Sequence, residues 1–171
     1  MRDLPRLKQE GITHIVNCAS PVMKDGREIL ESIWVSVKLD ATHYREIGIT
    51  ESNYLGLPIL DTNKFDISQF FEGATRFIDS AINPSDIPSD RQRQATAEAE
   101  ATSSGKVVVH CSAGINRSPT IVIAYLLMRK HNRFRSLEEA VRFVRSLREI
   151  SPCDGFLEQL IKLERRLSTS N

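Results

Sequence analysis

The 171-residue sequence is poor in cysteine and aromatic residues, with three cysteines, one tryptophan and an aromatic content of 6%. The cysteines show no regular spacing, which argues against a disulfide framework. No apolar run reaches the roughly 18 residues that a membrane-spanning helix needs. Residues 1–11 are charged and interrupted by Pro5, unlike a secretory signal. We therefore expect no membrane association and a cytoplasmic location, a nuclear one, or both, where thiols stay reduced.

The sequence also lacks an excess of one charge sign, since 23 lysines and arginines face 22 aspartates and glutamates. No nucleic-acid partner is expected. The charge is unevenly distributed, because residues 111–171 contain 11 basic and 6 acidic side chains. This positive half would favour anionic substrates, although basic helices are also common as solvated faces.

The length and the hydrophobic content of 40% are typical of one globular domain over residues 1–171. Residues 84–104 differ from the rest, because they contain two prolines and four serines and have almost no apolar side chains. We expect a flexible insertion there. The sequence leaves open whether it is a tolerated surface loop or a regulatory segment.

One segment places an arginine six positions after a cysteine. It runs from His110 to Ser118 and its sequence is HCSAGINRS. The valines at 107–109 predict a buried strand that leads into it. Ser118 and Pro119 are typical of an N-cap and a first helical residue. The segment therefore links the carboxyl end of a strand to a helix N-terminus, a place where phosphate groups bind.

The residue types in this loop suit chemistry on a phosphate dianion. A helix N-terminus and a neighbouring guanidinium favour the nucleophilic thiolate of Cys111. Arg117 can make two parallel hydrogen bonds to phosphate oxygens, which lysine cannot reproduce. Gly114 allows a tight turn, and Ser118 can donate its hydroxyl to the cysteine sulfur. The backbone N–H groups expected around the phosphate belong to Ser112, Ala113, Gly114, Ile115, Asn116 and Arg117.

His110 is expected to support the loop rather than to transfer protons, because a histidine at a strand end usually orients its neighbours. An isolated cysteine after a valine strand is most often a small buried hydrophobic residue. Only Cys111 has the arginine pattern, because Lys24 stands six positions after Cys18 and Gln159 six positions after Cys153. The sequence leaves open whether either thiol forms a disulfide with oxidised Cys111.

With the loop, three further segments resemble the cysteine-dependent dual-specificity phosphatases, most closely the small atypical members such as the vaccinia-H1-related enzyme. Residues 11–17 are GITHIVN, residues 54–62 are YLGLPILDT and residues 148–157 are REISPCDGFL. The four segments occur in the family's order. The resemblance covers nearly the whole chain outside the insertion.

The resemblance implies a protein phosphatase that hydrolyses phosphotyrosine and phosphoserine or phosphothreonine through a cysteinyl-phosphate, without a cofactor or metal. It assigns Asp61 as the general acid, whereas the residues alone also left Asp40, Asp66, Asp79 and Asp86 eligible. It places Arg148 at the pocket mouth, where it can meet a peptide substrate. The implied partners are phosphoproteins, with protein kinases among the candidates. Oligomeric state is not indicated.

The sequence departs from the family after Pro152, where Cys153 stands in place of the usual asparagine. We therefore expect one local structural hydrogen bond to be lost. Two alternative functions stay open: a catalytically weak phosphoprotein-binding module, and a phosphatase for a non-protein phosphate such as a phosphoinositide or an RNA 5′-phosphate. The uncharged loop positions Ser112, Ala113, Ile115 and Asn116 favour a less highly charged monoester.

Apolar periodicity predicts an α/β domain with a central mixed, mostly parallel sheet flanked by helices. Ser136 with Glu139 is typical of a helix-starting capping box, and Asp66 of a cap for a helix with an apolar stripe from Ile67 to Ala81. The expected strands are at 12–18, 34–39, 54–58 and 107–109. The expected helices are at 4–10, from 66, from 119, from 137 and around 156–167.

Overall fold

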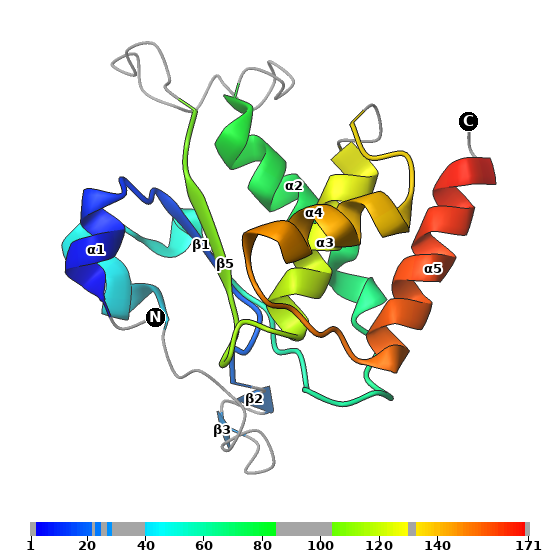
Figure 1. Ribbon diagram of the computed structural model, residues 1–171. Helices are drawn as coiled ribbons and strands as arrows, with labels where there is room; N and C mark the ends of the chain where they lie inside the picture. Colours follow the sequence, from blue (N-terminus) through cyan, green and yellow to red (C-terminus); the bar gives the residue numbers. More distant parts are fainter. Residues whose placement is uncertain are drawn as a thin grey trace, which may run out of the picture.

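The computed structural model describes residues 3–21, 23–24, 27–28, 40–84, 104–129 and 133–169 (Figure 1). The expected strand at 34–39 and most of the expected insertion at 84–104 lie outside these residues. The described helices are α1 (Leu4–Gln9), α2 (Phe71–Ile82), α3 (Arg117–Arg129), α4 (Leu137–Leu147) and α5 (Asp154–Thr169), with 3₁₀ turns η2 (Ala41–Ile47), η3 (Glu51–Asn53) and η4 (Ser68–Phe70). The described strands are β1 (His14–Asn17), β2 (Met23–Lys24), β3 (Arg27–Glu28), β4 (Tyr54–Gly56) and β5 (Val107–His110).

Three of these strands form a parallel sheet in the order β4-β1-β5. The central strand β1 pairs its Ile15 with Tyr54 on one side and with Val108 on the other. Strands β2 and β3 form a separate antiparallel pair. Because the three strands are parallel, their carboxyl ends meet at one edge. Residues 111–116, the Cys111 loop, start from that edge at the end of β5.

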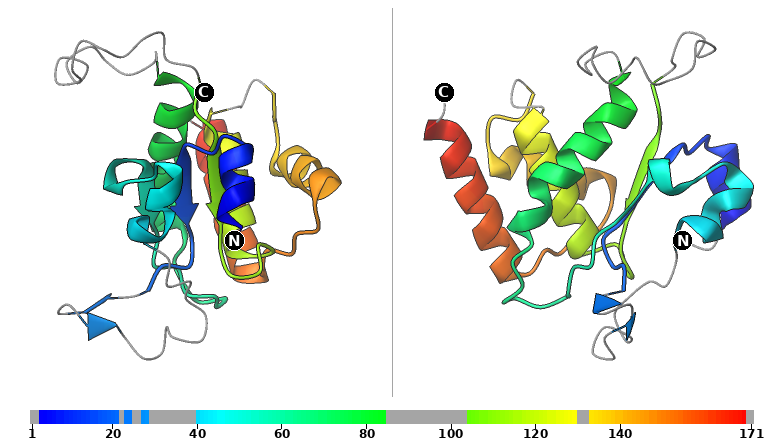
Figure 2. Two further views of the ribbon diagram at one scale, coloured as in Figure 1. Left: turned by 90° about the vertical axis from the view of Figure 1, so that its left-hand side faces the viewer. Right: turned by 180° about the vertical axis from the view of Figure 1, so that it is seen from behind.

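Helices cover both faces of this sheet, as Figure 2 shows. Successive strand residues point to opposite faces, so Ile15 packs with Leu7 of α1 and Tyr44 of η2, whereas Val16 packs on the opposite side. The same alternation in β5 directs Val108 toward the α1 side. This confirms the expected α/β architecture with helices flanking a sheet.

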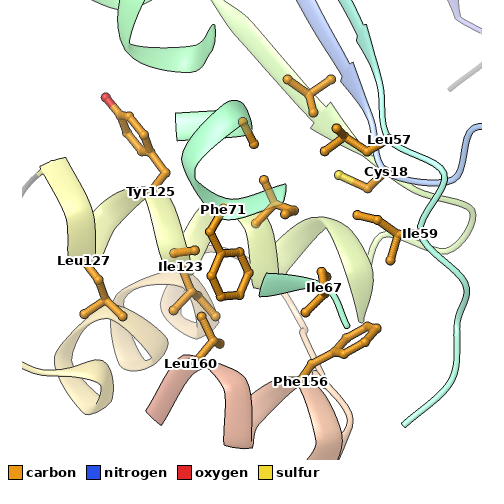
Figure 3. Close-up of a cluster of buried hydrophobic side chains, with 14 of the residues drawn as sticks. Cys18, Leu57, Ile59, Ile67, Phe71, Ile123, Tyr125, Leu127, Phe156 and Leu160 are labelled. Atoms are coloured by element: carbon orange, nitrogen blue, oxygen red, sulfur yellow. The ribbon is translucent and has the colours of Figure 1, made fainter. Parts of the chain in front are cut away.

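The larger apolar core lies between the sheet and helices α2 to α5 (Figure 3). Helix α3 packs against α2, α4, α5 and β5, so it is the central helix of this layer. Phe71 and Phe156 are 2% and 0% exposed, and both contribute large side chains to this core. The buried position of α3 fixes its N-terminus, and with it the end of the Cys111 loop.

Local sequence signals account for the helix starts. The Ser136 hydroxyl accepts a hydrogen bond from the Glu139 N–H at 3.2 Å, as the predicted cap requires. The Asp66 carboxylate accepts the Ser68 N–H at 3.1 Å. A 3₁₀ turn follows Asp66 before the α-helical part begins at Phe71. Within the described residues, no helix is long and apolar enough to cross a membrane.

Candidate active site

The segment between β5 and α3 forms a tight loop. Helix α3 begins at Arg117, one residue before the predicted N-cap, so Ser118 lies inside the first turn of the helix. Gly114 adopts a φ of 76°, a left-handed conformation that other residues rarely adopt. Gly114 also lies against the Arg148 guanidinium, because an added Cβ would come within 2.7 Å of its Nη2. The structure thus places the Arg148 guanidinium beside the Cys111 loop.

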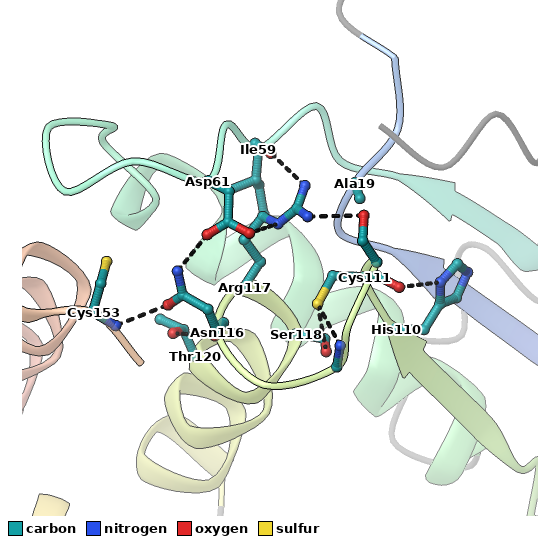
Figure 4. A network of polar contacts seen from close by, with 12 residues as sticks. Ala19, Ile59, Asp61, His110, Cys111, Asn116, Arg117, Ser118, Thr120 and Cys153 are labelled. Atoms are coloured by element: carbon teal, nitrogen blue, oxygen red, sulfur yellow. Dashed lines mark hydrogen bonds and ion pairs between the residues drawn. The ribbon is translucent and has the colours of Figure 1, made fainter. Parts of the chain in front are cut away.

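The Cys111 sulfur lies inside the loop and accepts two hydrogen bonds (Figure 4). The Gly114 N–H is 3.2 Å from Sγ, and the Ser118 hydroxyl is 3.3 Å from it. Donors around a sulfur stabilise negative charge on it. The cysteine itself is 4% exposed, so an incoming group must enter the loop to reach the sulfur.

Arg117 is the most deeply buried cation of the site, with 1% exposure. Its Nη1 donates to the Ile59 carbonyl at 3.2 Å and its Nη2 to the Ser112 hydroxyl at 3.0 Å. Its Nε lies 3.2 Å from the Asp61 carboxylate. A buried charge is stable only when it is paired and hydrogen bonded, and these contacts fix the guanidinium beside Cys111.

Asp61 is the aspartate that the fold brings to the loop. Its side chain is 32% exposed and contacts both Arg117 and Asn116. Asp40 instead caps η2 and Asp66 caps the turn before α2. Asp79 pairs with Arg129 at the far end of α3, at 3.3 Å. The fifth candidate, residue 86, lies outside the described residues.

We call residues 57–67, between β4 and η4, the acid loop, because they include the expected general acid Asp61. This loop rests on the start of α5. The Gln159 side chain donates to the Phe65 carbonyl at 2.9 Å and accepts the Ser68 N–H at 2.9 Å. A Cβ added at Gly155 would collide with the Asn63 carbonyl oxygen. These contacts hold the acid loop at a fixed distance from α5.

The segment around Pro152 is joined to the Cys111 loop by two hydrogen bonds. The Ser151 N–H donates to the Ile115 carbonyl at 2.7 Å, and the Cys153 N–H donates to the Asn116 side-chain oxygen at 2.9 Å. The sequence predicts the loss of one hydrogen bond here, where Cys153 replaces the family's usual asparagine. The structure shows that an asparagine on the loop side bonds this segment.

His110 forms a hydrogen-bonded chain behind the loop. Its Nδ1 donates to the Cys111 carbonyl at 3.3 Å, so its Nε2 accepts the Tyr44 hydroxyl at 3.2 Å. Burial lowers the pKa of His110 to about 4. The imidazole is therefore neutral near pH 7.

This buried histidine predicts a loss of stability on acidification. Between pH 6.5 and about 4 the unfolded chain binds a proton at His110 while the folded protein does not, so the free energy of unfolding falls as pH is lowered through this window. The His110 contribution reaches about 3 kcal/mol at pH 4. Urea titrations at several pH values should show that the free energy of unfolding varies less with pH in His110→Gln than in wild type. The same variation with pH in both proteins would contradict a lowered pKa at His110.

Cys18 is a neighbour of Cys111 that its position in the sequence did not reveal. It follows β1, and its N–H donates to the His110 carbonyl at 2.7 Å at the end of β5. Burial raises the pKa of the Cys18 thiol well above its usual range, and the charge of Cys111 raises it further, against an opposing effect of Arg117. All three cysteines are free thiols.

A family model and two human proteins match the sequence. Residues 91–166 match the family model described as the dual specificity phosphatase, catalytic domain. Dual specificity protein phosphatase 26 of Homo sapiens is 34% identical over 151 residues, which cover 85% of this chain and 62% of that protein. Dual specificity protein phosphatase 13B of Homo sapiens is 32% identical over 166 residues, covering 97% and 66% respectively. The chain thus spans a little under two thirds of these relatives.

A solved structure shares the fold. The Yvh1 phosphatase domain from Chaetomium thermophilum superposes with a TM-score of 0.63 at 26% sequence identity, over 96% of this chain and 84% of that one. This coverage includes both the sheet and the helical layer that position the loop.

Proposed function

Because this chain belongs to the dual specificity phosphatase family, we propose that it hydrolyses phosphate monoesters on proteins through a cysteinyl-phosphate intermediate. The observation that carries the proposal is the convergence of Cys111, Arg117 and Asp61 at one sheet edge, with Arg117 3.2 Å from the Asp61 carboxylate. A nucleophile, a cation for the phosphate oxygens and a proton donor are the three groups that this reaction requires.

In the first step the Cys111 thiolate attacks phosphorus and the bond to the leaving oxygen breaks. Asp61 gives its proton to that oxygen, so the product leaves as a neutral alcohol or phenol. Charge on the equatorial oxygens is stabilised by the Arg117 guanidinium and by loop N–H groups. The chain between residues 112 and 117 provides those N–H groups.

In the second step water attacks the phosphorus of the cysteinyl-phosphate and the S–P bond breaks. The Asp61 carboxylate takes a proton from this water, which restores the acid. The sulfur leaves as a thiolate, and the Ser118 hydroxyl, 3.3 Å from it, stabilises the developing charge. Inorganic phosphate is released, and the enzyme returns to its starting state.

We propose phosphotyrosine and phosphoserine or phosphothreonine side chains as substrates, with protein kinases among the phosphoproteins acted on. Ile115 is a loop residue whose side chain is 41% exposed, and Arg148 lies beside the loop, so both can contact the peptide around the phosphate. The cytoplasm, the nucleus or both is the proposed location, where the catalytic thiol stays reduced.

The role of Asp61 gives a direct test of the acid step. Asp61→Asn keeps a polar side chain of similar size and removes the transferable proton, so kcat/KM for p-nitrophenyl phosphate should fall by about 10²-fold. The assay is run with EDTA at pH values from acid to neutral. The Asp79→Asn variant is the matched control, because Asp79 pairs with Arg129 at the end of α3 that lies away from the Cys111 loop.

Equal activity of wild type and Asp61→Asn would remove Asp61 from the acid role. Absence of turnover from folded wild type, on p-nitrophenyl phosphate and on phosphopeptides alike, would favour the phosphoprotein-binding alternative.

A further inference from the structure

Asn116 connects two parts of the site through its side chain. Its Oδ1 accepts the Cys153 N–H at 2.9 Å, and its Nδ2 donates to Asp61 Oδ1. The side chain therefore bridges the segment before α5 and the acid loop, while its own backbone belongs to the Cys111 loop (Figure 4).

The Cys153 N–H determines which way the Asn116 amide faces. An amide oxygen accepts hydrogen bonds and an amide nitrogen donates them. With the oxygen held by a backbone N–H, the nitrogen must point toward the Asp61 carboxylate. The Asn116 backbone is also fixed, because its carbonyl accepts the Thr120 hydroxyl at 2.8 Å. The donor is thus fixed before any substrate arrives.

The two carboxylate oxygens of Asp61 have different partners. Arg117 Nε lies 3.2 Å from Oδ2, whereas Asn116 donates to Oδ1. During the reaction the Arg117 guanidinium is needed by the phosphate oxygens. Asn116 has no such second task, so its hydrogen bond can hold one oxygen of Asp61 while the other faces the leaving group.

We propose that Asn116 is a positioning residue that orients the general acid Asp61 through its side-chain amide. This inference rests on the proposed phosphatase function and assigns Asn116 a side-chain role beyond its backbone N–H. The amide transfers no proton. Its contribution is to place the acid at the leaving oxygen, and small misplacements of a catalytic group lower rates substantially.

Leaving-group dependence separates positioning of the acid from general damage to the loop. A basic leaving group such as phenolate needs the proton from Asp61, whereas 2,4-dinitrophenolate departs without it. Asn116→Ala should therefore lose about tenfold more kcat/KM toward phenyl phosphate than toward 2,4-dinitrophenyl phosphate. Inhibition by inorganic phosphate should stay within about twofold of wild type, because the Cys111 loop is intact.

A second variant tests the donor itself. Asn116→Asp keeps an oxygen for the Cys153 N–H but replaces the amide donor with a carboxylate oxygen, which cannot donate to Asp61. It should show the same selective loss on phenyl phosphate, even if Asn116→Ala folds poorly. The matched control is Asn83→Ala, because Asn83 also donates to an aspartate, Asp79, at 3.0 Å, far from the loop.

A double-mutant cycle completes the experiment. If Asn116 acts through Asp61, adding Asn116→Ala to Asp61→Asn should cause little further loss on phenyl phosphate. Additive losses, equal losses on both substrates or weakened phosphate inhibition would overturn the positioning role while leaving the phosphatase function intact. An inactive wild type on both substrates would instead overturn the phosphatase function, and the positioning role with it.

Discussion

Replacing Cys111 with serine is expected to abolish turnover of phosphorylated peptides while the loop still binds them. The serine hydroxyl is a far weaker nucleophile at neutral pH than a thiolate, so kcat should fall by a factor on the order of 10⁴ or more. The Gly114 N–H and the Ser118 hydroxyl, which contact the sulfur at 3.2 and 3.3 Å, can still donate to the serine oxygen. The loop geometry should therefore survive.

Two measurements check this result together. Phosphopeptide hydrolysis measures the lost nucleophile, and retention of the same phosphopeptide by immobilised Cys111→Ser measures the remaining pocket. Mass spectrometry of wild type quenched during turnover should show one phosphate added at Cys111. Residual turnover near the wild-type rate, or a phosphate on a different residue, would exclude Cys111 as the nucleophile.

Arg117→Lys should have the second largest effect, although it conserves the charge. The guanidinium makes contacts with Ile59, Ser112 and Asp61 in three directions, and a single ammonium cannot make all of them. Loss of the planar pair of donors to the phosphate should lower kcat/KM by about 10²–10³-fold.

The same substitution should also destabilise the fold, by about 1–3 kcal/mol, because a buried carbonyl at Ile59 loses its donor. Urea denaturation measures this loss, and steady-state kinetics measure the catalytic one. Arg129→Lys is the matched control, since Arg129 pairs with Asp79 at 3.3 Å at the other end of the same helix. Wild-type kinetics in Arg117→Lys would show that charge alone, not the guanidinium geometry, matters at residue 117. An equal kinetic loss in Arg129→Lys would show that the effect is not specific to the site.

The Cys111 loop was predictable because its chemistry lies within nine consecutive residues that a strand and a helix flank. The role of Asp61 was not predictable from spacing, which left five aspartates eligible. Only the family resemblance distinguished Asp61 from the other four. The sheet supplies the physical reason, because parallel strands β4 and β5 bring residues 50 positions apart to one edge. Alternation along β5 similarly directs His110 to Tyr44, a partner 66 residues earlier.

The side-chain role of Asn116 could not be predicted, because it depends on an amide orientation that a backbone N–H at Cys153 determines. The predicted N-cap at Ser118 was two residues late for a related reason, since α3 begins at Arg117. The hydroxyl that suggested a cap donates to the cysteine sulfur instead. Asn116 and Ser118 each have several possible hydrogen-bond partners, and the tertiary structure determines which partner each side chain binds.

Gly155 lies so close to the Asn63 carbonyl that no larger side chain fits between them, which limits how related sequences can change at this position. A side chain at 155 would push the acid loop away from its place, yet no residue of the reaction would have changed. A substitution at 155 is therefore tolerated only together with a rearranged backbone near 63. We expect these two positions to vary in a correlated way among related chains, although 92 residues separate them.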